Sequence, residues 1–187
     1  MKILTTLALV LLTAASAQAA NYDIDNGHSQ AVFSLKHMGV SNFYGVFHHV
    51  TGSVSWDKAS PERASIEVAV RADSVFTADK KRDGHIKSLD FMSAKEFETL
   101  NFKSTSVKKR KDGQFDVAGN LTFRGVTKSV TAVVTAVGEG KDPWGGYRAG
   151  FEARLSIDRS DYGSKAMIPA VSDRINLIIA VEAIQKK

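Results

Sequence analysis

The sequence predicts an all-β protein, an eight-stranded antiparallel up-and-down barrel with one short helical insertion between the third and fourth strands. Three observations predict this fold. Apolar residues alternate with more polar ones through most of the chain, residues typical of tight turns separate the alternating segments, and a single segment, residues 73–97, breaks the alternation. Alternation of period two indicates a strand with one apolar face and one wetter face.

Eight segments show this alternation. The longest clean series places Phe115, Val117, Leu121 and Phe123 on one face of a single strand. The predicted strands, each with such an apolar face, span residues 29–37, 44–57, 64–72, 99–108, 114–124, 127–138, 146–158 and 174–185.

Short turn sequences join most of these segments. Ser60-Pro61, Asp112-Gly113, Arg124-Gly125 and the run 142–146 contain residues that favour tight turns. Short connections make neighbouring strands antiparallel, and eight strands in this order can close into a barrel without exposed edges. The interior of such a barrel is either filled by side chains or holds one small ligand, and alternation alone does not separate the two.

The segment that breaks the alternation is expected to contain a helix. Asp79 is suited to cap a short helix whose apolar side carries Ile86 and Leu89. This helix is expected to lie either over one mouth of the barrel as a lid or on its surface with a small core of its own, and the pattern leaves both arrangements open.

The first residues predict a secretory leader before the domain. Lys2 stands before an apolar run over residues 3–12, and small residues follow up to Ala17-Gln18-Ala19. This order predicts a signal peptide over residues 1–19 and therefore an exported protein. The remainder, residues 20–187, is expected to be a single domain.

Charge and cysteine content exclude several function classes. The chain has no cysteine, which excludes thiol chemistry, iron–sulfur clusters and cysteine zinc sites. The net charge of +5 is too mild to predict a nucleic-acid partner. The basic run 108–111 is interpreted as a solvated hairpin tip, with a patch for anionic lipid as the alternative.

The polar residues form no catalytic arrangement of convincing spacing. The chain has no G-x-S-x-G nucleophile elbow and no carboxylate pair on one rigid face, so we expect a protein that is not an enzyme. His37 and His48 could meet across the first hairpin, but two imidazoles without a carboxylate make a weak metal site. A metal or haem carrier is kept as an alternative.

Aromatic residues are concentrated in and beside the predicted strands. A strand of about 11 residues at ~3.3 Å per residue spans roughly 36 Å, and a tilt of ~40° leaves roughly 28 Å along the barrel axis. A long, thin hydrocarbon would match an interior of this length, and each buried CH₂ group would contribute about 0.8 kcal/mol.

Motifs spread along the chain carry a resemblance to a known family. They include Tyr22-x-Ile24-Asp25, Arg82-Asp83-Gly84-His85-Ile86, Gly119-Asn120-Leu121-Thr122 and Asp142-Pro143-Trp144-Gly145-Gly146. In this order and at these spacings, the chain resembles the YceI-like polyisoprenoid-binding proteins of the bacterial periplasm. The resemblance implies a lipocalin-like barrel whose pore holds a polyprenyl phosphate or a quinone tail, without a cofactor. It also implies links to envelope stress and to quinone-using membrane proteins and, more weakly, a homodimer.

Six residues are the candidate ligand-binding residues under this resemblance. His85, together with Arg82 and Asp83, is expected either to bind a polar headgroup or to hold the helix on the barrel. The second role is favoured because a capped helix needs polar partners. A barrel packed solid, acting as a ligand-free interaction module, is a further alternative. The other five candidates are aromatic residues expected at the wall and mouth of the pore, namely Phe33, Phe43, Phe47, Phe76 and Phe91.

Overall fold

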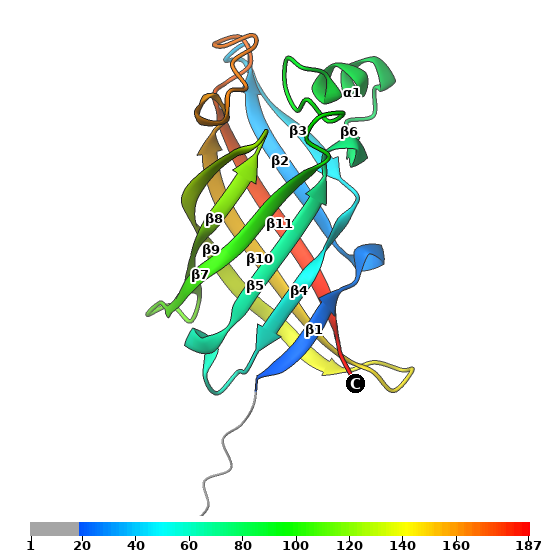
Figure 1. Ribbon diagram of the computed structural model, residues 1–187, viewed down its shortest axis with the longest axis vertical. Helices are drawn as coiled ribbons and strands as arrows, with labels where there is room; N and C mark the ends of the chain where they lie inside the picture. The colour runs from blue at the N-terminus through cyan, green and yellow to red at the C-terminus, as the bar shows by residue number, and fades with distance from the viewer. Residues whose placement is uncertain (1–18) are drawn as a thin grey trace, which may run out of the picture.

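The computed structural model describes residues 19–187, which form a tall, closed barrel with one short α-helix at one end (Figure 1). The predicted leader, residues 1–19, lies outside the described residues apart from Ala19. Short 3₁₀-helices span Asn26–His28, Pro61–Arg63, Ala72–Ser74 and Arg159–Tyr162. The helix is α1 (Lys80–Lys87), and the strands are β1 (Ala20–Ile24), β2 (Gln30–His37), β3 (Ser41–Phe47), β4 (Val50–Trp56), β5 (Ser65–Arg71), β6 (Val75–Phe76), β7 (Thr99–Lys109), β8 (Phe115–Phe123), β9 (Val126–Lys141), β10 (Tyr147–Asp158) and β11 (Arg174–Gln185).

The first six strands form three interrupted strands, β1 with β2, β3 with β4, and β5 with β6. β1 pairs with β4 and β4 with β5, while β2 pairs with β3 and β3 with β6. Short breaks therefore divide three strands without changing their neighbours. Counted as continuous strands, eight antiparallel strands follow one another in chain order. The predicted eight-stranded up-and-down barrel, with one helical insertion between the third and fourth strands, is confirmed.

Strand β11 closes the barrel. One of its edges pairs with β10, and its other edge pairs first with β2, where Leu177 lies opposite Phe33, and then with β1, where Ala183 lies opposite Ile24. β1 was not among the predicted strands. Its alternation is limited to Tyr22 and Ile24, and two apolar positions beside a leader are too few to indicate a strand.

Helix α1 begins as predicted. The Asp79 side chain accepts a hydrogen bond from the Arg82 backbone N–H at 2.9 Å, which satisfies a donor that the helix start leaves without a partner. Ile86 faces the barrel interior, but Leu89 lies beyond the end of the helix and is 73% exposed. The prediction that both residues form the apolar side of the helix is therefore wrong for Leu89. Within residues 19–187, no helix is long and apolar enough to cross a membrane.

The two ends of the barrel interior differ. At the lower end, away from α1 in Figure 1, the Trp56 ring meets Phe115 and Phe151 edge-on, with ring centroids 5.5 and 5.3 Å away. All three side chains are buried, and edge-to-face contact is a favourable arrangement of aromatic rings. A solid aromatic core therefore closes the lower end of the interior.

Gly52 allows β4 and β5 to approach each other closely. Its φ of +141° is rarely adopted by other residues, and a Cβ atom at this position would overlap the carbonyl oxygen of Glu67 on β5. We expect Gly52→Ala to lower the free energy of unfolding by about 1–3 kcal/mol, because backbone strain and a displaced strand both oppose it. Urea unfolding checks this. Gly138→Ala is the matched control, since a Cβ there meets no atom within 4 Å, and equal stability of the two variants would contradict the prediction.

Candidate functional site

A cavity of about 320 Å³ opens at the upper end of the barrel, beside α1. Ligand sites in proteins typically occupy about 300–1,000 Å³. The lining combines the upper halves of the strands with α1 and with the loop that precedes β11. Its residues are Phe33, Leu35, His37, Ser41, Phe43, Phe47, Arg82, His85, Ile86, Phe91, Met92, Leu100, Phe123, Ile157, Arg159, Ser164, Met167, Val171, Ile175 and Leu177.

A second cavity, of about 110 Å³, lies deeper in the same interior and is lined by apolar residues alone. The two cavities share Phe47, Leu100 and Leu177, which therefore stand between them. With the aromatic core below, the lumen is a blind pocket. Its polar side chains are confined to the upper part, and its deep end is apolar.

The structure brings five of the six predicted site residues to the upper cavity. Phe33 lies between two other aromatic rings, 6.2 Å from Phe43 and 5.6 Å from Phe47 between ring centroids. Its ring lies across Gly45, the residue opposite it on β3, where a Cβ atom would overlap it. His85 and Phe91 complete the five. Phe76 lies outside this lining; it is 50% exposed, with its ring 5.6 Å from that of His48.

Two charged residues of α1 bind one buried threonine. Arg82 donates from Nε to Thr77 Oγ1 at 2.9 Å and from Nη2 to the Thr77 carbonyl at 2.6 Å. Asp83 accepts from the backbone N–H and the hydroxyl of Thr77. These contacts tie the helix to the end of β6. The Arg82 guanidinium also lies 4.9 Å from the centre of the Phe43 ring, so this side chain both anchors α1 and forms part of the cavity wall.

His85 lines the cavity, and Asp90 and Phe91 contact its ring. Its Nε2 is 2.9 Å from Asp90 Oδ2, and its ring meets Phe91 edge-on with centroids 5.0 Å apart. The histidine and the phenylalanine therefore form one unit where the segment after α1 crosses the cavity.

Arg159 is a cavity residue that the sequence reasoning missed. It is 2% exposed, and its guanidinium donates to the backbone carbonyls of Ser164, Ala166, Val171 and Ser172 at 2.8–3.0 Å. Burial lowers the pKa of Arg159, and the nearby Asp173 opposes this shift. The guanidinium also lies 5.4 Å from the centre of the Phe91 ring.

The length of one connection could have drawn attention to Arg159. Fifteen residues, 159–173, separate β10 from β11. Apart from the short 3₁₀-helix at its start the loop is irregular, and long irregular loops are uncommon in compact domains and are often functional. The loop folds around the arginine and supplies Ser164, Met167 and Val171 to the cavity.

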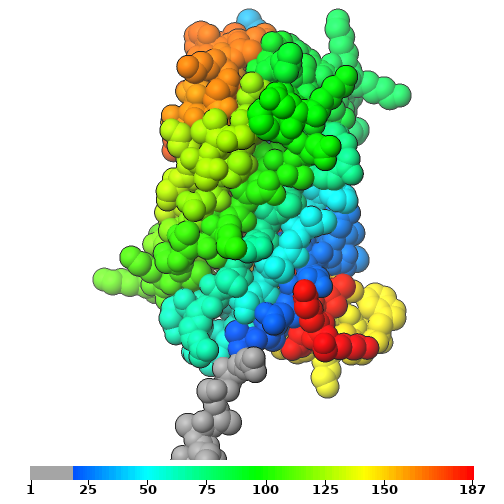
Figure 2. Space-filling model, in the orientation of Figure 1, coloured from blue at the N-terminus to red at the C-terminus, as the bar shows by residue number. Residues whose placement is uncertain are grey.

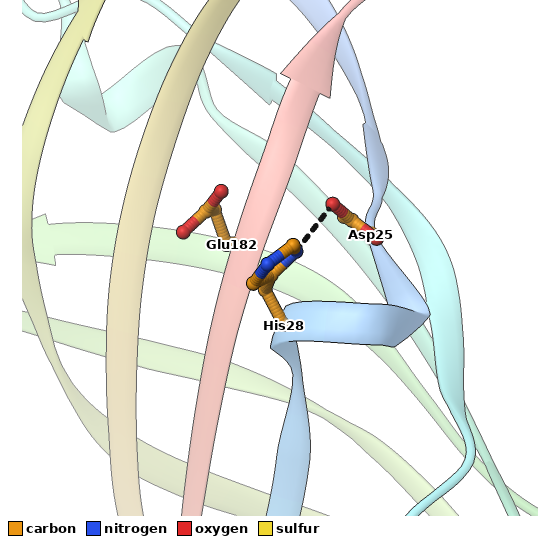
Figure 3. A group of neighbouring side chains, drawn as sticks. All are labelled: Asp25, His28 and Glu182. Carbon is orange, nitrogen blue, oxygen red and sulfur yellow. Dashed lines mark hydrogen bonds and ion pairs between the residues drawn. The ribbon is translucent and has the colours of Figure 1, made fainter. Parts of the chain in front are cut away.

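Asp25, His28 and Glu182 form a cluster away from the cavity (Figure 3). Each offers one atom that could hold a metal ion, and these atoms lie within 4.8 Å of one another. Arg148 already bridges the carboxylates, since its Nη1 is 2.8 Å from Asp25 Oδ2 and 2.5 Å from Glu182 Oε1. The charge that a cation would supply is thus supplied by the arginine, and the cluster joins β10 and β11 to the end of β1.

The proposed meeting of His37 and His48 is wrong. In the register of the β2–β3 hairpin, His37 lies opposite Ser41, whereas Phe47, the neighbour of His48, lies opposite Ala31. Six strand positions of about 3.3 Å separate these pairs, a distance of roughly 20 Å. A metal site shared by the two imidazoles is therefore not formed in this hairpin.

Comparison with known proteins identifies the family. Residues 22–183 match the YceI-like domain. The chain belongs to the YceI-like family. A UPF0312 protein of Pseudomonas fluorescens is 46% identical over 195 residues, covering 100% of this chain and 98% of the relative. The protein YceI of Salmonella arizonae is 41% identical over 184 residues, covering 97% and 96%.

Solved YceI-like structures share the barrel. The Campylobacter jejuni YceI protein is 32% identical, with a TM-score of 0.71 over 81% of this chain and 90% of that one. A domain from Saccharophagus degradans, described as polyisoprenoid-binding and implicated in plant cell wall breakdown, superimposes with a TM-score of 0.68 over 90% of this chain and all of that one. At 15% identity, the second comparison concerns the fold alone.

The Arg148 cluster makes stability dependent on pH. Hydrogen bonds from Arg148 and then His28 lower the pKa of Asp25 from 3.8 to about 2, so this carboxylate stabilises the folded state above pH 3.8 and loses its contribution as the pH falls toward 2. We expect Arg148→Met to lower the free energy of unfolding at pH 7, and the gap to the unmodified protein to narrow below pH 4.

Urea unfolding between pH 7 and pH 2 measures this gap. Arg154→Met is the control, because Arg154 pairs with Glu152 on the exposed surface, where ion pairs contribute little. A gap that stays constant across the pH range would show that Asp25 is not the group involved.

Proposed function

We propose that this YceI-like protein binds a long apolar lipid of polyisoprenoid type in the barrel lumen and carries it through the periplasm. The observation that supports the proposal most directly is the blind lumen, in which a cavity of about 320 Å³ adjoins an all-apolar one of about 110 Å³ across shared lining residues. The fold shared with a domain described as polyisoprenoid-binding supports the choice of ligand class. The predicted leader supports the location.

The isoprenoid chain would enter past α1 and extend toward the aromatic core. Phe33, Phe43, Phe47 and Phe91 would contact its first units. The chain would then pass between Leu100 and Leu177 into the deep cavity, where every lining residue is apolar. Each buried CH₂ group would add about 0.8 kcal/mol to binding, so a longer tail that fits the lumen binds more tightly than a shorter one.

A polar headgroup would remain at the upper end. His85 and the guanidinium groups of Arg82 and Arg159 belong to the lining there. Four of the five N–H donors of Arg159 are used by loop carbonyls, which leaves one on Nη1 for a ligand. A phosphate or a quinone carbonyl would accept such a hydrogen bond. The proposed ligand is accordingly a polyprenyl phosphate or a quinone, passed to or from membrane proteins that use it.

The polar side chains around the lumen already form hydrogen bonds within the protein, which supports binding without catalysis. Arg82 and Arg159 are engaged with backbone and threonine oxygens, and His85 with Asp90. A filled barrel acting as an interaction module is less favoured, because the interior above the Trp56 ring contains two cavities.

Narrowing the passage between the cavities tests the proposal. Leu100→Trp places a large ring where the two cavities meet, and Asn101→Trp places the same ring on the outer face of the same strand. With delipidated protein offered polyprenyl phosphates and quinones of graded length, we expect Leu100→Trp to weaken binding of the longest chains at least 10-fold and Asn101→Trp to leave it unchanged. Native mass spectrometry counts the bound species.

Circular dichroism confirms that both variants are folded. Folded Leu100→Trp protein that binds long chains as tightly as the unmodified protein would contradict the placement of the tail. Failure of the unmodified protein to bind any of these lipids would contradict the function itself.

A further inference from the structure

Five large apolar side chains are exposed at the upper end of the barrel. They come from three separate segments, namely the β2–β3 turn, the segment after α1 and the loop before β11. We name them the apolar rim, and their exposed fractions are 65% for Met38, 84% for Val40, 73% for Leu89, 51% for Met167 and 40% for Ile168. In Figure 2 these segments make up the top of the molecule. Exposed apolar groups gathered in one region indicate a surface that contacts a protein or a membrane.

The apolar rim is continuous with the lumen. Met167 belongs both to the rim and to the lining of the upper cavity. His37 and Ser41, which flank the turn with Met38 and Val40, also line that cavity. A surface that covers the rim would therefore lie directly over the entrance that the proposed lipid must use.

The rim is presented by a fixed backbone. Met38 N–H donates to the Ala170 carbonyl, and Ser172 N–H donates to the Lys36 carbonyl at 2.9 Å, so the β2–β3 turn and the loop before β11 hold each other. Arg124 donates to the Leu89 carbonyl at 2.8 Å. Met38 and Met167 have positive φ angles of 52° and 61°, a conformation that costs free energy for residues other than glycine. The surrounding contacts hold these side chains outward despite that cost.

Lysines surround the rim without partners. Within residues 19–187, Lys36, Lys80, Lys81 and Lys165 form no ion pair. Four neighbouring acidic groups form hydrogen bonds within the protein, since Asp79 caps α1, Asp83 binds Thr77, Asp90 binds His85 and Asp173 binds Ser160. Asp161, in the loop before β11, is exposed, so the four lysines outnumber the one carboxylate here without such a partner. The rim therefore offers aliphatic groups together with free ammonium groups.

We propose that this end of the barrel docks on the surface of a bilayer that contains anionic phospholipid. Aliphatic side chains lie at the boundary of the acyl chains and lysines lie near phosphates when a protein binds to a membrane interface. In this orientation the lumen opens onto the membrane, and a lipid passes between them without crossing water. The purpose of docking rests on the proposed carrier function, whereas docking itself is measured without cargo.

The lower end provides the matched comparison. Val137 is 70% exposed and Trp144, in the β9–β10 hairpin, is 81% exposed, and the basic run 108–111 lies in the β7–β8 hairpin at the same end. These features make the lower end the alternative docking surface, including the anionic-lipid patch considered from the sequence.

Vesicle flotation distinguishes the two ends. The protein, purified from the periplasm of an expressing bacterium so that the predicted leader is absent, is mixed with vesicles of phosphatidylethanolamine and phosphatidylglycerol and, separately, of phosphatidylcholine. We expect the unmodified protein and Val137→Asp/Trp144→Asp to float with the phosphatidylglycerol vesicles, and Val40→Asp/Leu89→Asp to float at least 10-fold less. Both double variants change the charge equally at exposed positions, and none of the four residues lines the upper or the deep cavity.

Three results would overturn the docking proposal: no flotation of the unmodified protein, unchanged flotation of the folded rim variant, or loss of flotation only in the lower-end variant. Lysine substitution adds a second measurement, since Lys80→Gln/Lys81→Gln should reduce binding to phosphatidylglycerol vesicles several-fold. An equal reduction on phosphatidylcholine would contradict the role given to charge. Loading of each variant with polyprenyl phosphate in detergent is measured separately, so a protein that docks but does not load refutes the carrier function alone.

Discussion

Closure of the hydrogen-bonded sheet by β11 is the constraint on which the rest of the structure depends. Because β11 pairs with β10 on one edge and with β1 and β2 on the other, the backbone polar groups on both of its edges are satisfied within the sheet. The wall can therefore enclose a hollow apolar space. The Arg148 cluster reinforces this closure where the end of β1 meets β10 and β11.

The barrel interior changes along its axis from a filled aromatic lower end to a hollow upper end with polar groups. Trp56, Phe115 and Phe151 fill the lower end, the deep cavity above them is apolar, and the polar groups Arg82 and Arg159 stand at the upper end. An amphipathic lipid has the same order of parts, from tail to headgroup. The loop held by Arg159 and the helix held on Thr77 shape the entrance.

The sequence predicted the parts of this architecture that depend on local pattern. Period-two alternation located eight strands, and Asp79 located the start of α1, because both signals lie within a few neighbouring residues. Positions that depend on tertiary packing were less accessible. The distance between His37 and His48 follows from hairpin register, the outward position of Phe76 from the end of a two-residue strand, and the burial of Arg159 from a loop folded around it.

The central claim is that the lumen holds an isoprenoid chain. Its most direct test is native mass spectrometry of the protein purified from the periplasm of an expressing bacterium, followed by organic extraction and lipid mass analysis. We expect one polyprenyl or quinone species to be bound per chain and released on denaturation. Protein that is purified without lipid, and binds none when such lipids are offered, would contradict the binding of an isoprenoid chain in the lumen.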